Sequence, residues 1–186
     1  MPPLFLVGYR ATGKSSVGRI LAERLSVPFA DTDSMVEENT CGLSFAEYFA
    51  NRGEEAFRDL EEGALRRILA ERPATGGPVV ATGGGIIVRP ANVVAMREAG
   101  PVVWLTASVE TIRSRLAADR FTPKSRPPLL SGASAFDEVA QVLSRREPLY
   151  REAAHAEISA EGRDPSAVAD CVLEFLSSWT SGSVRR

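Results

Sequence analysis

One stretch near the N-terminus limits the possible folds of this chain more than any other: residues 8–15, with the sequence GYRATGKS. It matches the phosphate-binding pattern G-x-x-x-x-G-K-[ST] without a mismatch. An apolar run at residues 4–7 precedes it and predicts a buried parallel strand, while apolar residues at helical spacing follow it and predict a helix. The stretch therefore joins a strand to a helix, which is the context that this pattern requires.

The residue types in this loop each have a chemical reason. Two glycines, Gly8 and Gly13, let the backbone turn tightly, so that its N–H groups and the helix N-terminus come close to phosphate oxygens. Lys14 can reach the β- and γ-phosphates, and the Ser15 hydroxyl can bind Mg²⁺. A glycine-rich turn that only caps a helix is the weaker interpretation, because every position matches in the right context. We expect the ATP phosphates to be bound by Gly8, Ala11, Thr12, Gly13, Lys14, Ser15 and Ser16.

The other apolar segments predict an alternation of strands and helices. Four further strands are expected, at 28–33, 79–82, 102–105 and 156–159. Helices are expected between them, and their start signals are a capping box, an N-cap serine and a cap followed by proline, at Ser44–Glu47, Ser108 and Asp164–Pro165. Five strands that alternate with helices indicate an α/β fold with three layers, α/β/α, around a five-stranded parallel sheet.

The length of 186 residues suits a single domain, which we expect to span residues 1–176. Residues 121–135 are rich in proline and basic side chains and are expected to form a mobile lid. Residues 177–186 are rich in Ser, Gly and Arg and are expected to be a frayed tail. Gly53 is expected to break the helical pattern that begins at Ser44.

The composition argues against several classes of partner. The formal net charge of −2 offers no electrostatic reason to expect nucleic acid or an anionic membrane. No stretch approaches the ~20 apolar residues of a membrane span, and the N-terminus lacks the basic region of a signal peptide, so a cytoplasmic protein is expected. Cys41 and Cys171 form no C-x-x-C pair and are expected to be reduced. The single histidine, His155, is expected to be a surface or packing residue.

Two of the expected strands end in residues that can do chemistry beside a phosphate. Asp31 and Asp33 lie two apart at the end of the second strand, where one could hold Mg²⁺ through water and the other could accept a proton from an acceptor hydroxyl. The alternative is a turn that caps the next helix. Gly83-Gly84-Gly85 follows the third strand and can offer backbone N–H groups to a ligand, although a flexible turn is an equal alternative.

Three arginines are candidates for binding anionic groups. Arg58 lies three residues before Glu61 on an expected helix, and spacing alone favours a solvated ion pair over a guanidinium held ready for a substrate carboxylate. Arg126 lies in the expected lid and could close over phosphates. Arg146 lies near a helix end, where a cation also suits the helix dipole.

In this order along the chain, these motifs resemble shikimate kinase. The resemblance covers residues 4 to about 176 and is specific because it links the phosphate loop to motifs at 31–33, 53–61, 82–85, 126–127 and 146–150. It implies a P-loop NTPase of the nucleoside monophosphate kinase type. It also implies transfer of the γ-phosphoryl group of ATP to the 3-hydroxyl of shikimate, with Mg²⁺. We expect a monomer that acts on these small molecules.

The resemblance also implies the roles of individual residues. Lys14, Asp33 and Arg126 would be catalytic, with Asp33 as the base, and Ser15 with Asp31 would hold Mg²⁺. The phosphates would also contact Arg126, and Arg115 and the turn at Asp164 would flank the adenine. The acceptor would be bound by Asp33, Phe49, Phe57, Arg58, Glu61, Gly83, Gly84, Gly85 and Arg146.

Two features depart from the family pattern or have no assigned role, and the first affects the expected stiffness and register of the lid. Arg126 is followed by two prolines where the family usually has one, and Arg10 in the phosphate loop has no role beyond possible exposure to solvent.

The alternative functions are a gluconate-type or nucleoside monophosphate kinase on the same fold, or a nucleotide-dependent switch without turnover. The two kinases give no reason for both the Arg58/Glu61 pair and the triple glycine, and a switch would not need an acceptor pocket with a carboxylate clamp.

Overall fold

The computed structural model describes residues 1–71, 74–118 and 138–183. Its five strands are β1 (Leu4–Val7), β2 (Phe29–Asp31), β3 (Val79–Ala81), β4 (Val102–Thr106) and β5 (Ala156–Ser159). The helices before β3 are α1 (Lys14–Leu25), α2 (Thr32–Glu38) and α3 (Phe45–Ala70). The later ones are the short 3₁₀ helix η1 (Ile86–Val88), α4 (Pro90–Ala99), α5 (Val109–Ala118), α7 (Glu138–Ala153) and α8 (Pro165–Ser183). The expected lid at 121–135, with Arg126, lies outside the described residues.

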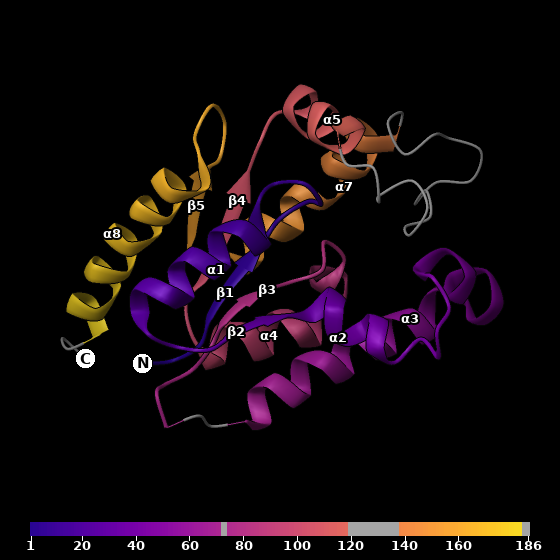
Figure 1. Cartoon of the computed structure of the whole chain (residues 1–186), viewed down its shortest axis with the longest axis horizontal. Helices are drawn as coiled ribbons and strands as arrows, with labels where there is room; N and C mark the ends of the chain where they lie inside the picture. Colours follow the sequence, from indigo (N-terminus) through magenta and orange to yellow (C-terminus); the bar gives the residue numbers. More distant parts are fainter. Residues whose placement is uncertain (72–73, 119–137, 184–186) are drawn as a thin grey trace.

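The strands form one parallel sheet in the order β2-β3-β1-β4-β5, and helices cover both of its faces (Figure 1). Side chains alternate between the faces along β1, as they must in a strand. Leu4 and Leu6 pack against α1 and α8, whereas Phe5 and Val7 pack against α3, α4 and α7. The three-layer α/β/α prediction is therefore confirmed, and its physical basis is a central strand that is buried on both sides.

The predicted helix starts are confirmed by their capping contacts. Ser44 and Glu47 form a capping box at the start of α3, in which the Ser44 hydroxyl accepts the Glu47 N–H and Glu47 accepts the Ser44 N–H. The Asp164 carboxylate accepts the N–H groups of Ser166 and Ala167 at the start of α8. Gly53 has φ 82° and ψ 173°, a conformation that L-residues rarely adopt, and it divides α3 at the predicted position.

Two segments differ from the sequence-based expectation. The second strand ends at Asp31, and the next seven residues form α2, which we did not predict. Asp31 is its N-cap, with its Oδ1 accepting the Asp33 N–H at 3.0 Å, so the two carboxylates are not side by side on an extended strand. Helix α8 runs to Ser183, past the predicted end near Leu176, because the Trp179 ring packs against His155 and Phe175.

The structure also bears on the bulk expectations. Among the described residues, no helix is long and apolar enough to cross a membrane. Both cysteines are free. His155 is a packing residue, as expected: its Nδ1 accepts the Val102 N–H at 3.0 Å, and its ring lies 4.5 Å from that of Trp179.

Candidate active site

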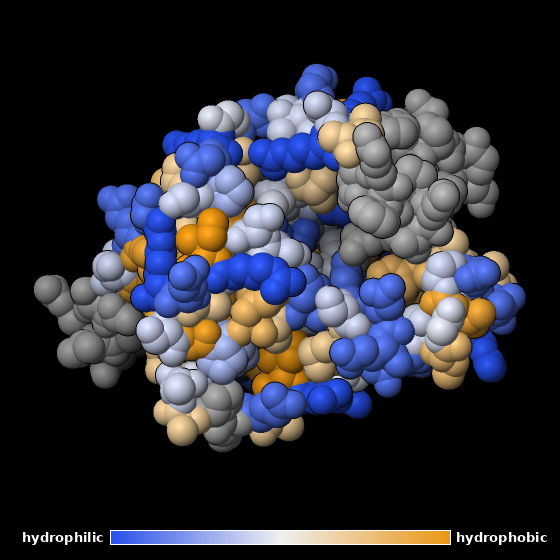
Figure 2. All heavy atoms as spheres, viewed as in Figure 1, coloured by the Kyte–Doolittle hydropathy of each residue, from blue (hydrophilic) through white to orange (hydrophobic). Residues whose placement is uncertain are grey.

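The ends of β1, β2 and β3 lie level with one another, because Ala81 is in register with both Leu6 and Asp31. The segments that follow these three strands therefore meet at one edge of the sheet, where ligands bind in open α/β folds. In the space-filling view a hollow with hydrophilic side chains in its depth lies between α3 and the helices α5 and α7 (Figure 2).

The phosphate loop has the geometry that its glycines predict. Gly8 and Gly13 have φ of 145° and 95°, in the range that L-residues rarely adopt, and Ala11 also has a positive φ, of 61°. A side chain at Gly8 would approach the Leu105 carbonyl to 2.5 Å, so the glycine is required for space as well. The Lys14 ammonium donates to the Gly8 and Tyr9 carbonyls at 2.9 and 2.7 Å. The lysine side chain thus lies inside the phosphate loop, where its ammonium is expected to contact bound phosphates.

Two oxygen atoms at the start of α1 and the end of β2 fit a magnesium site. The Ser15 hydroxyl donates to Asp31 Oδ2 at 2.6 Å, which brings together two hard oxygen donors from distant segments. Mg²⁺ prefers oxygen ligands and is commonly held by one or two protein groups together with nucleotide phosphates and water. Among the described residues no cluster of three His, Cys, Asp or Glu side chains could hold a metal alone. The donor set therefore suits an ion that arrives with a nucleotide.

A pocket beside the phosphate loop combines an aromatic wall with charged groups. Its apolar side consists of Phe45, Phe49 and Phe57, whose rings pack edge to face or tilted, with centroids 5.1–5.3 Å from that of Phe57. The rest of the lining consists of charged side chains, two glycines and a tyrosine of the phosphate loop: Arg10, Asp33, Arg58, Glu61, Arg146, Gly84, Gly85 and Tyr9. Nearly all the predicted acceptor residues thus line one pocket.

The Arg58 and Glu61 side chains are buried, with exposed fractions of 5% and 3%, and their closest N···O distance is 2.5 Å. The solvated-pair interpretation is therefore wrong. Burial lowers the pKa of Arg58, but Glu61 and Glu54 outweigh it, and the net direction is upward. Burial raises the pKa of Glu61, and the Arg58 guanidinium opposes that rise. The charge of each group is thus favoured by the other group and disfavoured by burial.

The triple glycine is needed for space, and none of its members has the positive φ that would favour glycine. A methyl group on Gly83 would collide with the Asp33 carboxylate, and one on Gly85 would collide with the Arg58 guanidinium. The Gly83 N–H is not open to a ligand, since it donates to the Thr32 hydroxyl at 2.7 Å. The flexible-turn alternative fails because the turn is packed against the two side chains expected to bind the acceptor.

Helix α7 brings a second group of residues to the glycine turn. Arg146 and Tyr150 lie four residues apart, and both donate to the Gly84 carbonyl, at 3.2 and 2.6 Å. We expected Arg146 at the site but missed Tyr150 and Thr32. The i, i+4 spacing from Arg146 is a signal that could have identified Tyr150. For Thr32, the only signal in the sequence was its position between two aspartates.

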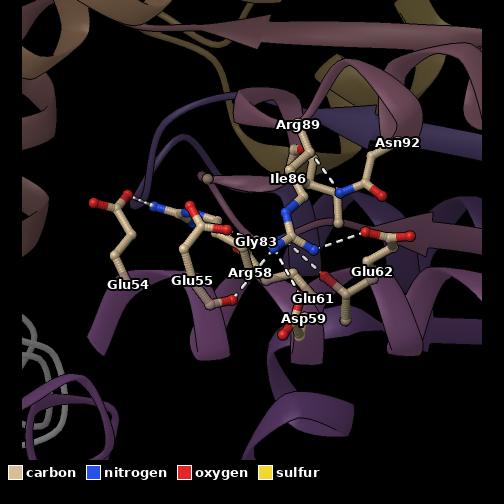
Figure 3. A network of polar contacts seen from close by, with 12 residues as sticks. Glu54, Glu55, Arg58, Asp59, Glu61, Glu62, Gly83, Ile86, Arg89 and Asn92 are labelled. Atoms are coloured by element: carbon tan, nitrogen blue, oxygen red, sulfur yellow. Dashed lines mark hydrogen bonds and ion pairs between the residues drawn. The ribbon is translucent and has the colours of Figure 1, made fainter. Parts of the chain in front are cut away.

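The outer side of α3 is tied to the segment after η1 by a separate network (Figure 3). Arg89, which precedes α4, forms ion pairs with Glu55, Asp59 and Glu62 at 2.7–2.9 Å. The glycine turn leads into η1 and then to Arg89, so this network connects two of the segments that line the pocket. These pairs are more exposed than the Arg58 pair, with the Arg89 side chain 22% exposed.

The residues expected to flank adenine lie on the other side of the phosphate loop. Arg115 of α5 donates to the carbonyls of Ala11 and Ala160, both at 3.1 Å, and so links the loop to the segment after β5. Asp164 begins α8 a few residues further on. Arg10, to which we assigned only possible exposure, is 8% exposed and faces the acceptor pocket. Its placement makes it a lining residue of that pocket.

Together, a strand–loop–helix phosphate site and an adjoining pocket rich in guanidinium groups define a P-loop kinase whose acceptor is a small anionic molecule. A model of the shikimate kinase family matches residues 10–177 of this chain. The chain belongs to the shikimate kinase family.

Relatives and solved structures agree with this assignment. A shikimate kinase of Rhodopirellula baltica is 43% identical over 171 residues, which cover 92% of this chain and 88% of the relative. One of Nitratidesulfovibrio vulgaris is 44% identical over 173 residues, covering 93% and 92%. The structure of shikimate kinase from Acinetobacter baumannii in complex with shikimate superposes with a TM-score of 0.84 at 32% identity, covering 96% and 94%.

A gluconokinase of Sinorhizobium meliloti is also similar in structure, with a TM-score of 0.62 over 98% of this chain and 95% of the gluconokinase. At 14% sequence identity this likeness shows the fold alone. The fold is thus shared with a kinase for another small molecule. The fold alone does not identify the acceptor, and the evidence for it comes from the residues that line the pocket.

Proposed function

We propose that this protein transfers the γ-phosphoryl group of ATP to the 3-hydroxyl group of shikimate, giving shikimate 3-phosphate and ADP. The observation that carries the proposal is the pair Arg58 and Arg146, which reach one pocket from α3 and α7 beside the phosphate loop. A guanidinium offers paired planar donors that match a carboxylate, and shikimate carries one carboxylate on a small ring.

The other walls of the pocket suit the rest of this acceptor. The rings of Phe49 and Phe57 provide an apolar surface for the carbon skeleton. Asp33 lies at the pocket beside Gly83 and can accept hydrogen bonds from ring hydroxyls. The Arg58 guanidinium donates a short hydrogen bond to Glu61, and it donates a second one to the Glu54 carboxylate at 2.9 Å. The guanidinium is thus held in place before the acceptor binds.

The chemical step is an in-line displacement at the γ-phosphorus. The acceptor hydroxyl oxygen forms a bond to phosphorus while the bond from phosphorus to the β,γ-bridging oxygen breaks, and ADP leaves with that electron pair. The hydroxyl proton passes to the Asp33 carboxylate. The ammonium of Lys14 stabilises the negative charge on the phosphoryl oxygens, an interaction that strengthens in the transition state.

Mg²⁺ bound with the nucleotide would neutralise charge on the β- and γ-phosphates, and Ser15 and Asp31 are the residues that would hold it. Arg126 is proposed as a further cation on the phosphates, and Arg115 and Asp164 as the sides of the adenine site. We further propose that the enzyme acts in the cytoplasm and as a monomer; the acceptor pocket found among the described residues is lined by side chains and backbone of a single chain.

The test is an ADP-release assay of the purified protein with ATP, Mg²⁺ and one acceptor at a time. Shikimate should give sustained turnover, whereas gluconate and nucleoside monophosphates should give none. Lys14→Met is the matched variant: it should fold normally and lose most turnover with shikimate, because the transition-state charge loses its cation. Turnover with gluconate but not shikimate would reject the acceptor, and slow hydrolysis unaffected by any acceptor would favour the switch.

A further inference from the structure

The Gly84 carbonyl is held by two side chains of the same helix. The Tyr150 hydroxyl lies 2.6 Å from this oxygen, and Arg146 Nη1 lies 3.2 Å from it. The two residues are one helical turn apart on α7, so their side chains reach the glycine turn from one face of the helix. Of the two, only Arg146 belongs to the proposed acceptor site.

Tyr150 is rigidly placed by its surroundings. Its side chain is fully buried, and its ring stacks on that of Trp104 in β4, with centroids 5.7 Å apart and an interplanar angle of 18°. Burial raises the pKa of the Tyr150 hydroxyl well above its usual range, and Arg146 only partly opposes this. The hydroxyl is therefore protonated at neutral pH and donates a hydrogen bond to the Gly84 carbonyl.

A fixed carbonyl determines the orientation of the next N–H. The peptide group is planar and trans, so the Gly85 N–H points away from the Gly84 oxygen and hence away from α7. Three consecutive glycines have no side chains to restrain these peptide planes, and glycine backbone is the most easily rotated. The pocket is lined by Gly84, Gly85 and Arg146, so the orientation of this peptide decides which backbone groups the acceptor meets.

We infer that Tyr150 is a positioning residue for the acceptor: by sharing the Gly84 carbonyl with Arg146, its hydroxyl sets both the Gly84–Gly85 peptide and the guanidinium at the pocket wall. The inference rests on the proposed function, since the acceptor is taken to be shikimate. It predicts that loss of one oxygen atom, outside the pocket lining, selectively weakens acceptor binding.

The experiment compares Tyr150→Phe with the parent protein in steady-state assays that vary shikimate and ATP separately. The KM for shikimate should rise roughly three- to tenfold, the effect of one lost hydrogen bond on a neutral group, while the KM for ATP stays within about twofold. The matched control is Val172→Ala, which leaves a cavity in the buried core between α1 and α8, on the opposite face of the sheet. It should lower the thermal midpoint without changing the KM for shikimate.

A double-mutant cycle with Arg146→Lys sharpens the test, because both side chains donate to one oxygen. Their effects on the KM for shikimate should not be additive. The inference is overturned if Tyr150→Phe leaves that KM unchanged, if both KM values rise together, or if Val172→Ala raises it equally. A parent protein that turns over ATP with another acceptor would overturn the proposed function first, and the inference with it.

Discussion

Two of the arginine–glutamate pairs on helix α3 have similar spacing and opposite environments. Arg58 pairs with Glu61 three residues on, and Arg66 pairs with Glu62 four residues back. In the first pair the side chains are 5% and 3% exposed, whereas in the second they are 77% and 20% exposed. The contact chemistry is the same, and the difference is whether the pocket and the glycine turn cover the pair.

This difference decides what each pair can do. An exposed pair contributes about 0–1 kcal/mol, because water screens the charges and two long side chains lose freedom. A buried pair is no better as a source of stability, since desolvation offsets its attraction, but removal of one partner leaves a buried charge and costs roughly 3–5 kcal/mol. The Arg58–Glu61 pair is therefore best explained by the guanidinium that it holds at the acceptor pocket.

The largest effect is expected from Arg58→Lys. A lysine does not reproduce the paired donors of a guanidinium, so shikimate affinity should fall by roughly 2–5 kcal/mol, or tens- to thousands-fold. Arg146→Lys should act in the same direction, whereas Arg66→Lys should leave affinity unchanged. Calorimetric titrations with shikimate and with an ATP analogue measure this.

Two further outcomes of these titrations would break the comparison. Intact shikimate affinity in Arg58→Lys, or an equal loss of ATP affinity, would assign Arg58 to the scaffold or to the nucleotide side. An analogue with a neutral group in place of the carboxylate serves as a control. It should bind the parent protein poorly and be penalised much less by the arginine variants.

The second prediction concerns the carboxylates of the two pairs. Glu61→Gln leaves the buried Arg58 charge with only the half-exposed Glu54, and should lower the free energy of unfolding by roughly 3 kcal/mol while weakening shikimate binding. Glu62→Gln should cost no more than about 1 kcal/mol, because its partners Arg66 and Arg89 remain in contact with water. Urea unfolding of both variants is the measurement, and equal losses would contradict the role of burial.

The third prediction uses two glycines near the same helix. Gly85→Ala places a methyl group against the Arg58 guanidinium, which must move, so shikimate affinity should fall about tenfold and stability by roughly 1–3 kcal/mol. Gly63 lies within α3, and a Cβ added there would have nothing within 4 Å. The variant Gly63→Ala should therefore raise the free energy of unfolding by about 0.5–1 kcal/mol. A Gly85→Ala protein with unchanged shikimate affinity would show that the guanidinium position is not decisive.

The smallest effect concerns His155, a half-buried group far from both pairs. Burial lowers the pKa of its imidazole, and Arg97 lowers it further. The folded protein then resists a protonation that the unfolded chain accepts below about pH 6.5. The contribution of His155 to the free energy of unfolding should therefore be fully present above that pH and decline as the pH falls through it. Urea midpoints at pH 7.5 and 5.5 should differ more for the parent than for His155→Gln. An equal change in the two proteins would assign the loss to other groups.

Features that depend on neighbouring residues were accessible from the sequence. The phosphate loop, the five strands, the Ser44–Glu47 capping box and the break at Gly53 follow from local spacing, because backbone conformation and capping are set within a few residues. Local signals also had limits: we missed α2, although Asp31 caps it, and we ended α8 too early because the ring packing of Trp179 is tertiary.

Features that depend on burial were decided only by the tertiary structure. Spacing alone could not distinguish Arg58–Glu61 from Arg66–Glu62, since exposure is set by segments distant in sequence. The same holds for the space that Gly85 leaves for Arg58, the bond from Tyr150 to Gly84, and the burial of Arg10. The sequence alone determined which residues could do the chemistry. Only the packing of α3 and α7 against the glycine turn decided which of their charges leave water and converge on one acceptor.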